Sequence, residues 1–306
     1  MKKVLLATEK PFSKEASDEI VKIGKNAGLD VVLLEKYSSK DELLNAVSDV
    51  NAMIIRSDVA DREVIECGKN LEIIVRAGAG YDNIDLKVAT EKNIIAMNTP
   101  GQNSNAVAEL AFGMMVMVAR GNYDGKTGTE LREKNLGLHA YGNVGKYMAK
   151  IAKGFGMNVF AFDPFLKDEQ IEVDGITPVH SVEELYEKCQ YISLHIPANE
   201  KTKKSINYSL ISSMPANAVL VNTARKEVID EEGLLKVMAE RKDVKYVSDI
   251  IPDNFNLFEE NFKGRFFFTP KKMGAQTEEA NVNAGVAAIN QIIDFFEKGD
   301  IKYKVN

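Results

Sequence analysis

Short apolar runs alternate with helical patterns along the whole chain. In the first third, the strand-like runs are "KVLLAT", "DVVLLEK", "AMIIRS", "LEIIVRAG" and "NIIAMNTP". Between the first two, "SKEASDEIVKIGKNAG" has the period of an amphipathic helix and ends on Gly28. A second series of runs comprises "KNLGLHAYG", "MNVFAFDP", "CQYISLHIP", "NAVLVNTAR", "KYVSDII" and "RFFFTP". This alternation predicts an α/β protein with two doubly wound parallel sheets and a ligand cleft between them.

Two long helices are predicted beside these units. Residues 103–120 are apolar nearly all round, which favours a buried helix that bridges two lobes. A second helix begins after Thr277, which can cap it, and Gly299 is its expected end. The apolar residues expected on one face of this helix are Val282, Val286, Ile289, Ile293 and Phe296.

Composition restricts the class of protein. The 306 residues are 45% hydrophobic and 27% charged, which is ordinary for a globular protein of two domains. A net charge of −6 argues against a nucleic-acid binder. The N-terminus does not resemble a signal peptide, and the apolar stretch from Leu110 spans about ten residues against the roughly 18 that cross a bilayer. Cys67 and Cys189 lack metal-ligand spacing, so we expect reduced thiols and no metal site. Together with the charge and the short apolar stretch, this predicts a cytoplasmic protein without a nucleic-acid or membrane partner.

The segment "LGLHAYGNVGKYMAKIAKGFGMNVFAFDPF" has the order of a dinucleotide site: strand, turn, helix, strand and acid. Gly142 and Gly145 would let the backbone approach a pyrophosphate, which the start of the helix would bind. Asp163 would accept from ribose hydroxyls and repel a 2′-phosphate, so the pattern favours NAD over NADP. Ala140 stands where the first glycine of G-x-G-x-x-G is usual. Loop glycines without a function remain the alternative.

Several ordered motifs together resemble the NAD-dependent D-2-hydroxyacid dehydrogenases, and most of all the short-form phosphoglycerate dehydrogenases among them. These motifs are "VRAGAGYDNID", "NTPGQNSNAVAEL", "SLHIP", "INYSLISSMPANAVLVNTAR" and "TPKKMGAQTEEA". The resemblance implies a flavodoxin-like substrate domain at residues 1–98 and 280–306 and a Rossmann-type NAD domain at 99–279. It also implies a homodimer formed through the nucleotide domain, without the serine-binding regulatory domain of longer relatives.

The same resemblance suggests which residues contact the cofactor. Asp249 matches the residue that orients the nicotinamide amide, and His195 is expected on the adenine side. The full set of expected cofactor contacts is Tyr141, Gly142, Asn143, Val144, Gly145, Asp163, His195, Ile196, Pro197, Thr202, Thr223, Ala224, Asp249 and Gly274.

A 2-hydroxy acid needs a cation for its carboxylate, and the resemblance assigns this to Arg225, whose planar fork suits bidentate capture. The expected contacts on the substrate domain are Arg56, Ser57, Arg76, Gly78, Ala79, Gly80 and Asn103. Two arginines at equivalent strand ends suggest a phosphorylated substrate. The alternatives are solvated arginines, a tight turn at the glycines, and a helix-capping role for Asn103.

The departures from the family pattern fall on the acid/base. Most relatives have a His in "TPHxG" with a supporting Glu, whereas this chain has "TPKKMG" and Asn254. Counted from Pro270 the His position is Lys271, and counted back from Gly274 it is Lys272; we slightly prefer Lys271. A lysine serves as a base only when its neutral form is accessible, so a neutral Asn254 suits this chemistry better than a carboxylate. An inactive site is the alternative.

The expected function is NAD-dependent oxidation of D-3-phosphoglycerate to 3-phosphohydroxypyruvate, the first step of serine synthesis, with Lys271 as acid/base and a small phosphorylated 2-hydroxy acid as partner. The alternatives are a reductase of glyoxylate or hydroxypyruvate and an inactive NAD-binding regulator.

Overall fold

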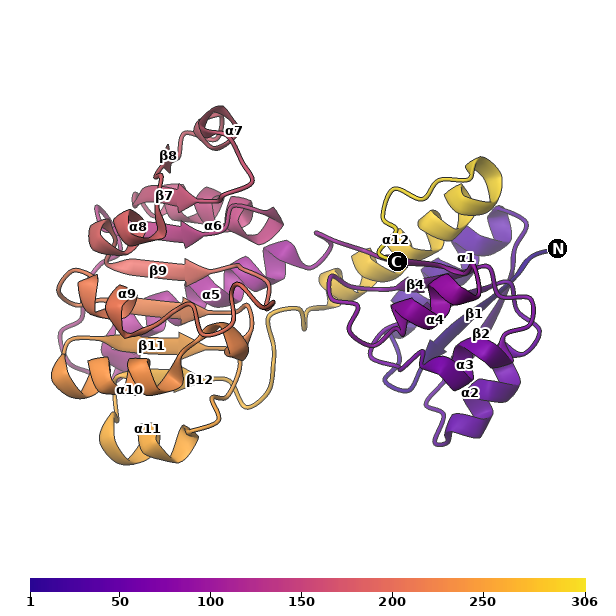
Figure 1. Ribbon diagram of the computed structural model, residues 1–306, viewed down its shortest axis with the longest axis horizontal. Helices are drawn as coiled ribbons and strands as arrows, with labels where there is room; N and C mark the ends of the chain where they lie inside the picture. The colour runs from indigo at the N-terminus through magenta and orange to yellow at the C-terminus, as the bar shows by residue number, and fades with distance from the viewer. The chain divides into compact units, whose positions relative to one another are not determined.

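The computed structural model describes residues 1–306, which form two compact units (Figure 1). The terminal unit contains residues 1–103 and 276–306, and the central unit contains residues 104–275. None of the helices combines the length and the apolar character needed to span a membrane.

The terminal unit is a five-stranded parallel sheet with strand order β2-β1-β3-β4-β5. Its strands are β1 (Lys3–Thr8), β2 (Asp30–Glu35), β3 (Ala52–Ile55), β4 (Ile73–Arg76) and β5 (Ile95–Asn98). Its helices are α1 (Lys14–Asn26), α2 (Lys40–Val47), α3 (Arg62–Cys67), α4 (Leu86–Glu91) and α12 (Glu278–Lys298). Alternate residues of β1 enter two different core clusters: Val4 and Leu6 pack with α1 and α12, and Leu5 and Ala7 pack with α2, α3 and α4. Helices therefore cover both faces of the sheet.

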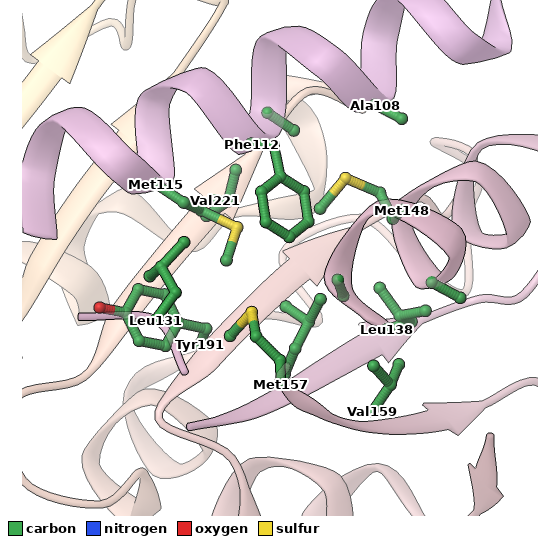
Figure 2. Close-up of a cluster of buried hydrophobic side chains, with 14 of the residues drawn as sticks. Ala108, Phe112, Met115, Leu131, Leu138, Met148, Met157, Val159, Tyr191 and Val221 are labelled. Carbon is green, nitrogen blue, oxygen red and sulfur yellow. The ribbon is translucent and has the colours of Figure 1, made fainter. Parts of the chain in front are cut away.

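The central unit is a seven-stranded parallel sheet with order β12-β11-β10-β9-β6-β7-β8. Its strands are β6 (Asn135–His139), β7 (Asn158–Phe162), β8 (Thr177–Pro178), β9 (Tyr191–Leu194), β10 (Val219–Asn222), β11 (Lys245–Ser248) and β12 (Phe266–Phe268). Its α-helices are α5 (Ser104–Ala119), α6 (Asn143–Gly154), α7 (Asp168–Glu172), α8 (Val182–Lys188), α9 (Tyr208–Ser213), α10 (Glu231–Glu240) and α11 (Phe255–Asn261), and its short 3₁₀ turns are η1 (Gly121–Tyr123) and η2 (Lys226–Val228). Figure 2 shows one core face, where Phe112 of α5 and Met148 of α6 meet beside Leu138 of β6.

The predicted fold class, two doubly wound parallel α/β sheets, is confirmed. Every strand-like run contains a strand, and the sequence analysis missed only the two-residue β8. The predicted ends of α12 are also confirmed. The Thr277 hydroxyl accepts the N–H of Ala280 at 3.1 Å, and Gly299 adopts a left-handed φ of 67°.

The predicted apolar face of α12 does contact the core. Ile289 is fully buried, and Val282, Ile293 and Phe296 are partly buried and pack against the same cluster. The buried residues of the helix are Ala280, Ala284, Gly285, Ala288, Ile289 and Ile292. Helix α12 packs closely against α1, and the two lie side by side in Figure 1. A Cβ on Gly285 would lie 2.5 Å from Cδ1 of Ile20, so the two helices approach each other along small residues.

Gly137 allows a similar approach beneath the predicted dinucleotide loop. It lies in β6, an interior strand of the larger sheet between β9 and β7. A Cβ at this position would lie 2.6 Å from Cδ1 of Ile192, 3.0 Å from Cγ of Leu185 and 3.1 Å from Cβ of Cys189. The missing side chain therefore lets α8 pack directly on the strand that leads into the loop.

We expect Gly137→Ala to lower the free energy of unfolding by about 1–3 kcal/mol, because the added methyl group overpacks this contact. Urea denaturation followed by circular dichroism measures the effect. Gly154→Ala is the matched control: Gly154 is exposed at the end of α6, and a Cβ there meets no atom within 4 Å. The control should be neutral or gain up to about 1 kcal/mol in helix propensity. Equal unfolding midpoints for the two variants would contradict this account of the packing.

Candidate active site

Three adjacent strands of the central unit each lead into an expected site residue. Arg225 follows β10, Asp249 follows β11, and the lysine pair follows β12. These strands are neighbours and parallel, so their carboxyl ends lie along one edge of the sheet. Ligand sites of open α/β sheets form at this edge.

Arg225 and Lys272 converge on one carbonyl oxygen. Nη1 of Arg225 and Nζ of Lys272 each donate to the carbonyl oxygen of Ala224, both at 2.9 Å. Buried Asn222 holds this turn: its Oδ1 accepts the N–H of Ala224, and its Nδ2 donates to the carbonyl of Arg225, both at 3.0 Å. Two cations at one oxygen form a concentrated positive charge, which suits a carboxylate and a developing oxyanion.

Lys271 makes a different contact. Its carbonyl oxygen accepts the hydroxyl of Thr269 at 2.6 Å, which closes the turn after β12. Both lysines belong to an exposed loop. The two residues therefore differ in what they contribute to the described contacts: a main-chain oxygen from Lys271 and an ammonium group from Lys272.

Asp249 joins the end of β11 to the lysine loop. Its side chain is completely buried, and Oδ2 accepts the N–H of Gly274 at 2.7 Å. A Cβ on Gly274 would lie 2.9 Å from this oxygen, so glycine makes the approach possible. Burial raises the pKa of Asp249 above its usual value, while the Gly274 N–H and the charges of Lys272 and Arg225 oppose the rise.

Asn254 is bound to Glu231 at the start of α10. Its backbone N–H and its Nδ2 donate to Oε2 of Glu231 at 3.0 and 2.9 Å, and the N–H of Asp253 donates to Oε1 at 2.9 Å. Asp253, which precedes Asn254 in this loop, forms an ion pair with Lys226 at 2.6 Å. The sequence analysis missed Glu231, because an acid in the first turn of a helix is common for dipole reasons alone.

The predicted dinucleotide loop connects β6 to α6. Gly142 is the N-cap of α6, and a Cβ on it would meet no atom within 4 Å. A Cβ on Gly145 would lie 2.7 Å from the carbonyl oxygen of Ala140, so this glycine is required for close packing. Both oxygens of Asp163 accept backbone N–H groups, from Tyr141 at 2.9 Å and from Phe165 at 3.0 Å. Gly142 and Asn143 are exposed at the start of the helix, where N–H groups can bind an anion.

Three buried polar atoms at this edge of the sheet have no partner within the protein. They are Nε2 of His195, Oγ1 of Thr223 and Oδ1 of Asp249, after strands β9, β10 and β11. Burial, followed by the nearby His139, lowers the pKa of His195 to about 3, so its ring is neutral at pH 7. Buried polar atoms normally have hydrogen-bond partners, so these three atoms fit a polar ligand such as NAD.

The loop after β9 carries the other expected cofactor contacts. Ile196 is buried, and the carbonyl oxygen of Pro197 accepts the hydroxyl of Thr202 at 2.6 Å. The Thr202 hydroxyl also accepts the N–H of Asn199 at 2.9 Å. A longer contact of 3.3 Å joins the hydroxyl to the carbonyl oxygen of Asn199, so its contacts lie within its own loop. Val144 is half-buried in the first turn of α6, and Ala224 carries the carbonyl described above.

In the terminal unit, the guanidinium of Arg56 forms hydrogen bonds with other residues of the same unit. Nη1 donates to the carbonyl oxygens of Lys10 and Pro11 at 3.1 and 2.9 Å, and Nη2 donates to Oδ1 of Asn281 at 2.7 Å. The group also lies 4.8 Å from the centroid of the Phe12 ring. Burial lowers the pKa of Arg56 from its usual value. These contacts join the loop after β1 to α12.

Arg76 lies across Gly78 at the end of β4. Its Nε donates to the carbonyl oxygen of Arg56 at 3.0 Å. Gly78 has a φ of 149°, and a Cβ there would overlap Nη1 of Arg76. Nδ2 of Asn98 donates to the carbonyl of Ala79 at 2.6 Å and fixes the same loop. The structure thus brings Arg56, Arg76 and the glycine loop together.

The remaining expected residues of this unit have simpler surroundings. Ser57 and Ala79 are exposed, Gly80 is half-buried, and Asn103 is half-buried immediately before α5. The sequence analysis missed Asp58, a buried acid that accepts the N–H of Glu9 at 2.7 Å and the hydroxyl of Tyr37 at 2.7 Å. Asp58 ties together the loops that follow β1, β2 and β3.

Comparison with known proteins agrees with this geometry. Residues 101–263 match the family model described as D-isomer specific 2-hydroxyacid dehydrogenase, NAD binding domain. The crystal structure of NAD⁺-bound 3-phosphoglycerate dehydrogenase from Entamoeba histolytica is 47% identical with a TM-score of 0.89, and the match covers 100% of this chain and 98% of the other.

Two similar curated proteins are named for different reactions. The D-3-phosphoglycerate dehydrogenase of Methanocaldococcus jannaschii is 38% identical over 83% of this chain, which spans only 51% of that protein's length. The hydroxypyruvate reductase of Thermotoga maritima is 33% identical over 92% of this chain and 95% of its own length. These matches, on a fold whose central sheet carries the expected dinucleotide loop, show that the chain belongs to the D-isomer specific 2-hydroxyacid dehydrogenase family and includes its NAD-binding domain.

Proposed function

We propose that this protein is an NAD-dependent D-2-hydroxyacid dehydrogenase that oxidises D-3-phosphoglycerate to 3-phosphohydroxypyruvate. The observation that supports it most is the convergence of Arg225 and Lys272 on the Ala224 carbonyl. The names of relatives such as the M. jannaschii and E. histolytica proteins support the phosphorylated substrate.

In the proposed reaction, Arg225 binds the substrate carboxylate through its planar fork and polarises the neighbouring C2–O bond. A neutral lysine accepts the proton of the C2 hydroxyl as the C2–H bond breaks and the ketone forms. Bound NAD supplies the acceptor for the departing hydride. In the reverse direction, the protonated lysine returns the proton to the alkoxide oxygen.

We assign the proton transfer to Lys272. Counting from Pro270 favoured Lys271, but the ammonium group of Lys272 is the one bonded beside Arg225. The charged side chains that neighbour Lys272 are Arg225, which donates to the same carbonyl, and Asp249. Asn254 is a neutral residue and donates to Glu231.

Arg76 and Arg56 are the proposed contacts for the phosphate group. Arg76 is the target for mutation, because the three hydrogen bonds of the Arg56 guanidinium join the loop after β1 to α12 and their loss would disturb the fold. The glycine loop at residues 78–80 would bind the carboxylate through its backbone N–H groups, and Ser57 and Asn103 would complete the substrate contacts.

The first test compares the two lysines. We expect Lys272→Ala to lower kcat for phosphoglycerate oxidation by about 10²–10⁴-fold, the range of a general base, while Lys271→Ala keeps most of the activity. The measurement is steady-state kinetics from neutral to alkaline pH, where the wild type should become faster as the lysine loses its proton. NAD affinity, measured by titration calorimetry, should be unchanged in both variants.

The opposite pattern would transfer the role to Lys271. Full activity of both variants would remove lysine chemistry from the mechanism. NAD binding by the wild type without turnover of any 2-hydroxy acid would favour the regulator alternative.

The second test concerns the substrate. We expect kcat/KM for 3-phosphohydroxypyruvate to exceed that for hydroxypyruvate by about tenfold or more, because a hydrogen bond to a charged group is worth about 1.5–3 kcal/mol. Arg76→Gln should reduce this preference and leave hydroxypyruvate turnover nearly unchanged. A wild type that turns over hydroxypyruvate or glyoxylate as well as the phosphorylated acid would instead support the reductase alternative, to which the T. maritima relative also points.

A further inference from the structure

Tyr141 connects the dinucleotide loop to the core of the central unit. It follows Ala140 and precedes Gly142, the N-cap of α6. Its side chain is fully buried, in the cluster that also contains Ala149 of α6. A Cβ on Gly145 would lie 3.5 Å from Cδ2 of the Tyr141 ring, so the first turn of α6 packs against this ring. The loop therefore rests on a buried aromatic side chain.

Two carboxylates from different segments hold Tyr141. Asp163, after β7, accepts its backbone N–H at 2.9 Å, and Asp174, in the turn between α7 and β8, accepts its hydroxyl at 2.8 Å. Nζ of Lys153 on α6 donates to the carbonyl of Asp174 at 2.7 Å, which ties this turn to the helix. Burial of the hydroxyl, followed by its bond to Asp174, raises the pKa of Tyr141 above its usual value, so the group stays a donor at neutral pH.

The residue before Tyr141 is conformationally strained. Ala140 has a backbone φ of 80°, in a region that residues other than glycine rarely adopt. Such conformations persist only where the surrounding contacts determine them. Ala140 donates its N–H to the carbonyl of Phe162 at 2.9 Å on one side, and the doubly bound Tyr141 holds it on the other. The path of the loop thus depends on what fixes Tyr141.

We propose that the hydrogen bond between the Tyr141 hydroxyl and the Asp174 carboxylate is a positioning contact for NAD. It fixes residues 140–142 and so sets where the free N–H groups at the start of α6 lie. These groups bind the cofactor's pyrophosphate. Asp174 acts through Tyr141 and is itself outside the expected cofactor contacts. The inference concerns cofactor binding and holds whichever 2-hydroxy acid is the substrate.

The test measures binding of NAD and ADP-ribose to the full chain by titration calorimetry, without substrate. We expect Tyr141→Phe and Asp174→Ala each to raise both dissociation constants by about tenfold, because each removes one partner of a charge-assisted hydrogen bond. Asp174→Asn, whose amide oxygen still accepts the hydroxyl, should raise them less. The double variant Tyr141→Phe/Asp174→Ala should be no weaker than either single variant, because both remove the same contact.

Tyr147→Phe, which alters a partly exposed tyrosine of α6, is the matched control and should leave the dissociation constants unchanged. Adenosine, which lacks the pyrophosphate, should bind all variants equally. A lower melting temperature with unchanged NAD and ADP-ribose affinity would reduce the contact to a structural role and overturn the proposal, as would an equal loss of adenosine binding. Asp174 is exposed, so Asp174→Ala provides the test even where Tyr141→Phe does not fold.

Discussion

The shared direction of β10, β11 and β12 is the constraint on which the candidate active site depends. Because these strands are neighbours and parallel, the segments that follow three consecutive strands end side by side. The Ala224 carbonyl then accepts from Arg225 and Lys272, whose positions differ by 47 residues, the difference between 272 and 225. A helix or an antiparallel hairpin would not bring these groups to one edge.

The charges at this edge compensate one another. Burial of Asp249 disfavours its ionised form, and the charges of Lys272 and Arg225 act in the opposite direction. Asp249 is also bonded to the Gly274 N–H, so one side chain influences both the charge and the path of the lysine loop. Glu231 binds Asn254 and Asp253 on the neighbouring loop, where the family pattern would have an acid at position 254.

Several glycines allow close contacts that any larger residue would prevent. Gly137 lets α8 pack on β6, Gly145 lets α6 approach the Ala140 carbonyl, and Gly274 lets its loop approach Asp249. In the terminal unit, Gly78 gives the Arg76 guanidinium its place, and Gly285 lets α12 reach α1. At each of these positions a methyl group would displace a strand, a helix or a neighbouring side chain.

The sequence by itself determined the parallel α/β fold, the strands, the caps of α12 and the dinucleotide loop, because apolar period, turn residues and caps are local signals. The family resemblance led to Arg225, Asp249 and the lysine pair, and the positions of Arg225 and the lysines after apolar strands supported it. Tertiary structure decided what local patterns do not encode. The buried seam of α12 combines small residues such as Gly285 with the large residues Ile289 and Ile292. Likewise, only packing could place Lys272 beside Arg225, Asn254 on Glu231 and the Tyr141 hydroxyl on Asp174, since each contact joins segments that folding alone brings together.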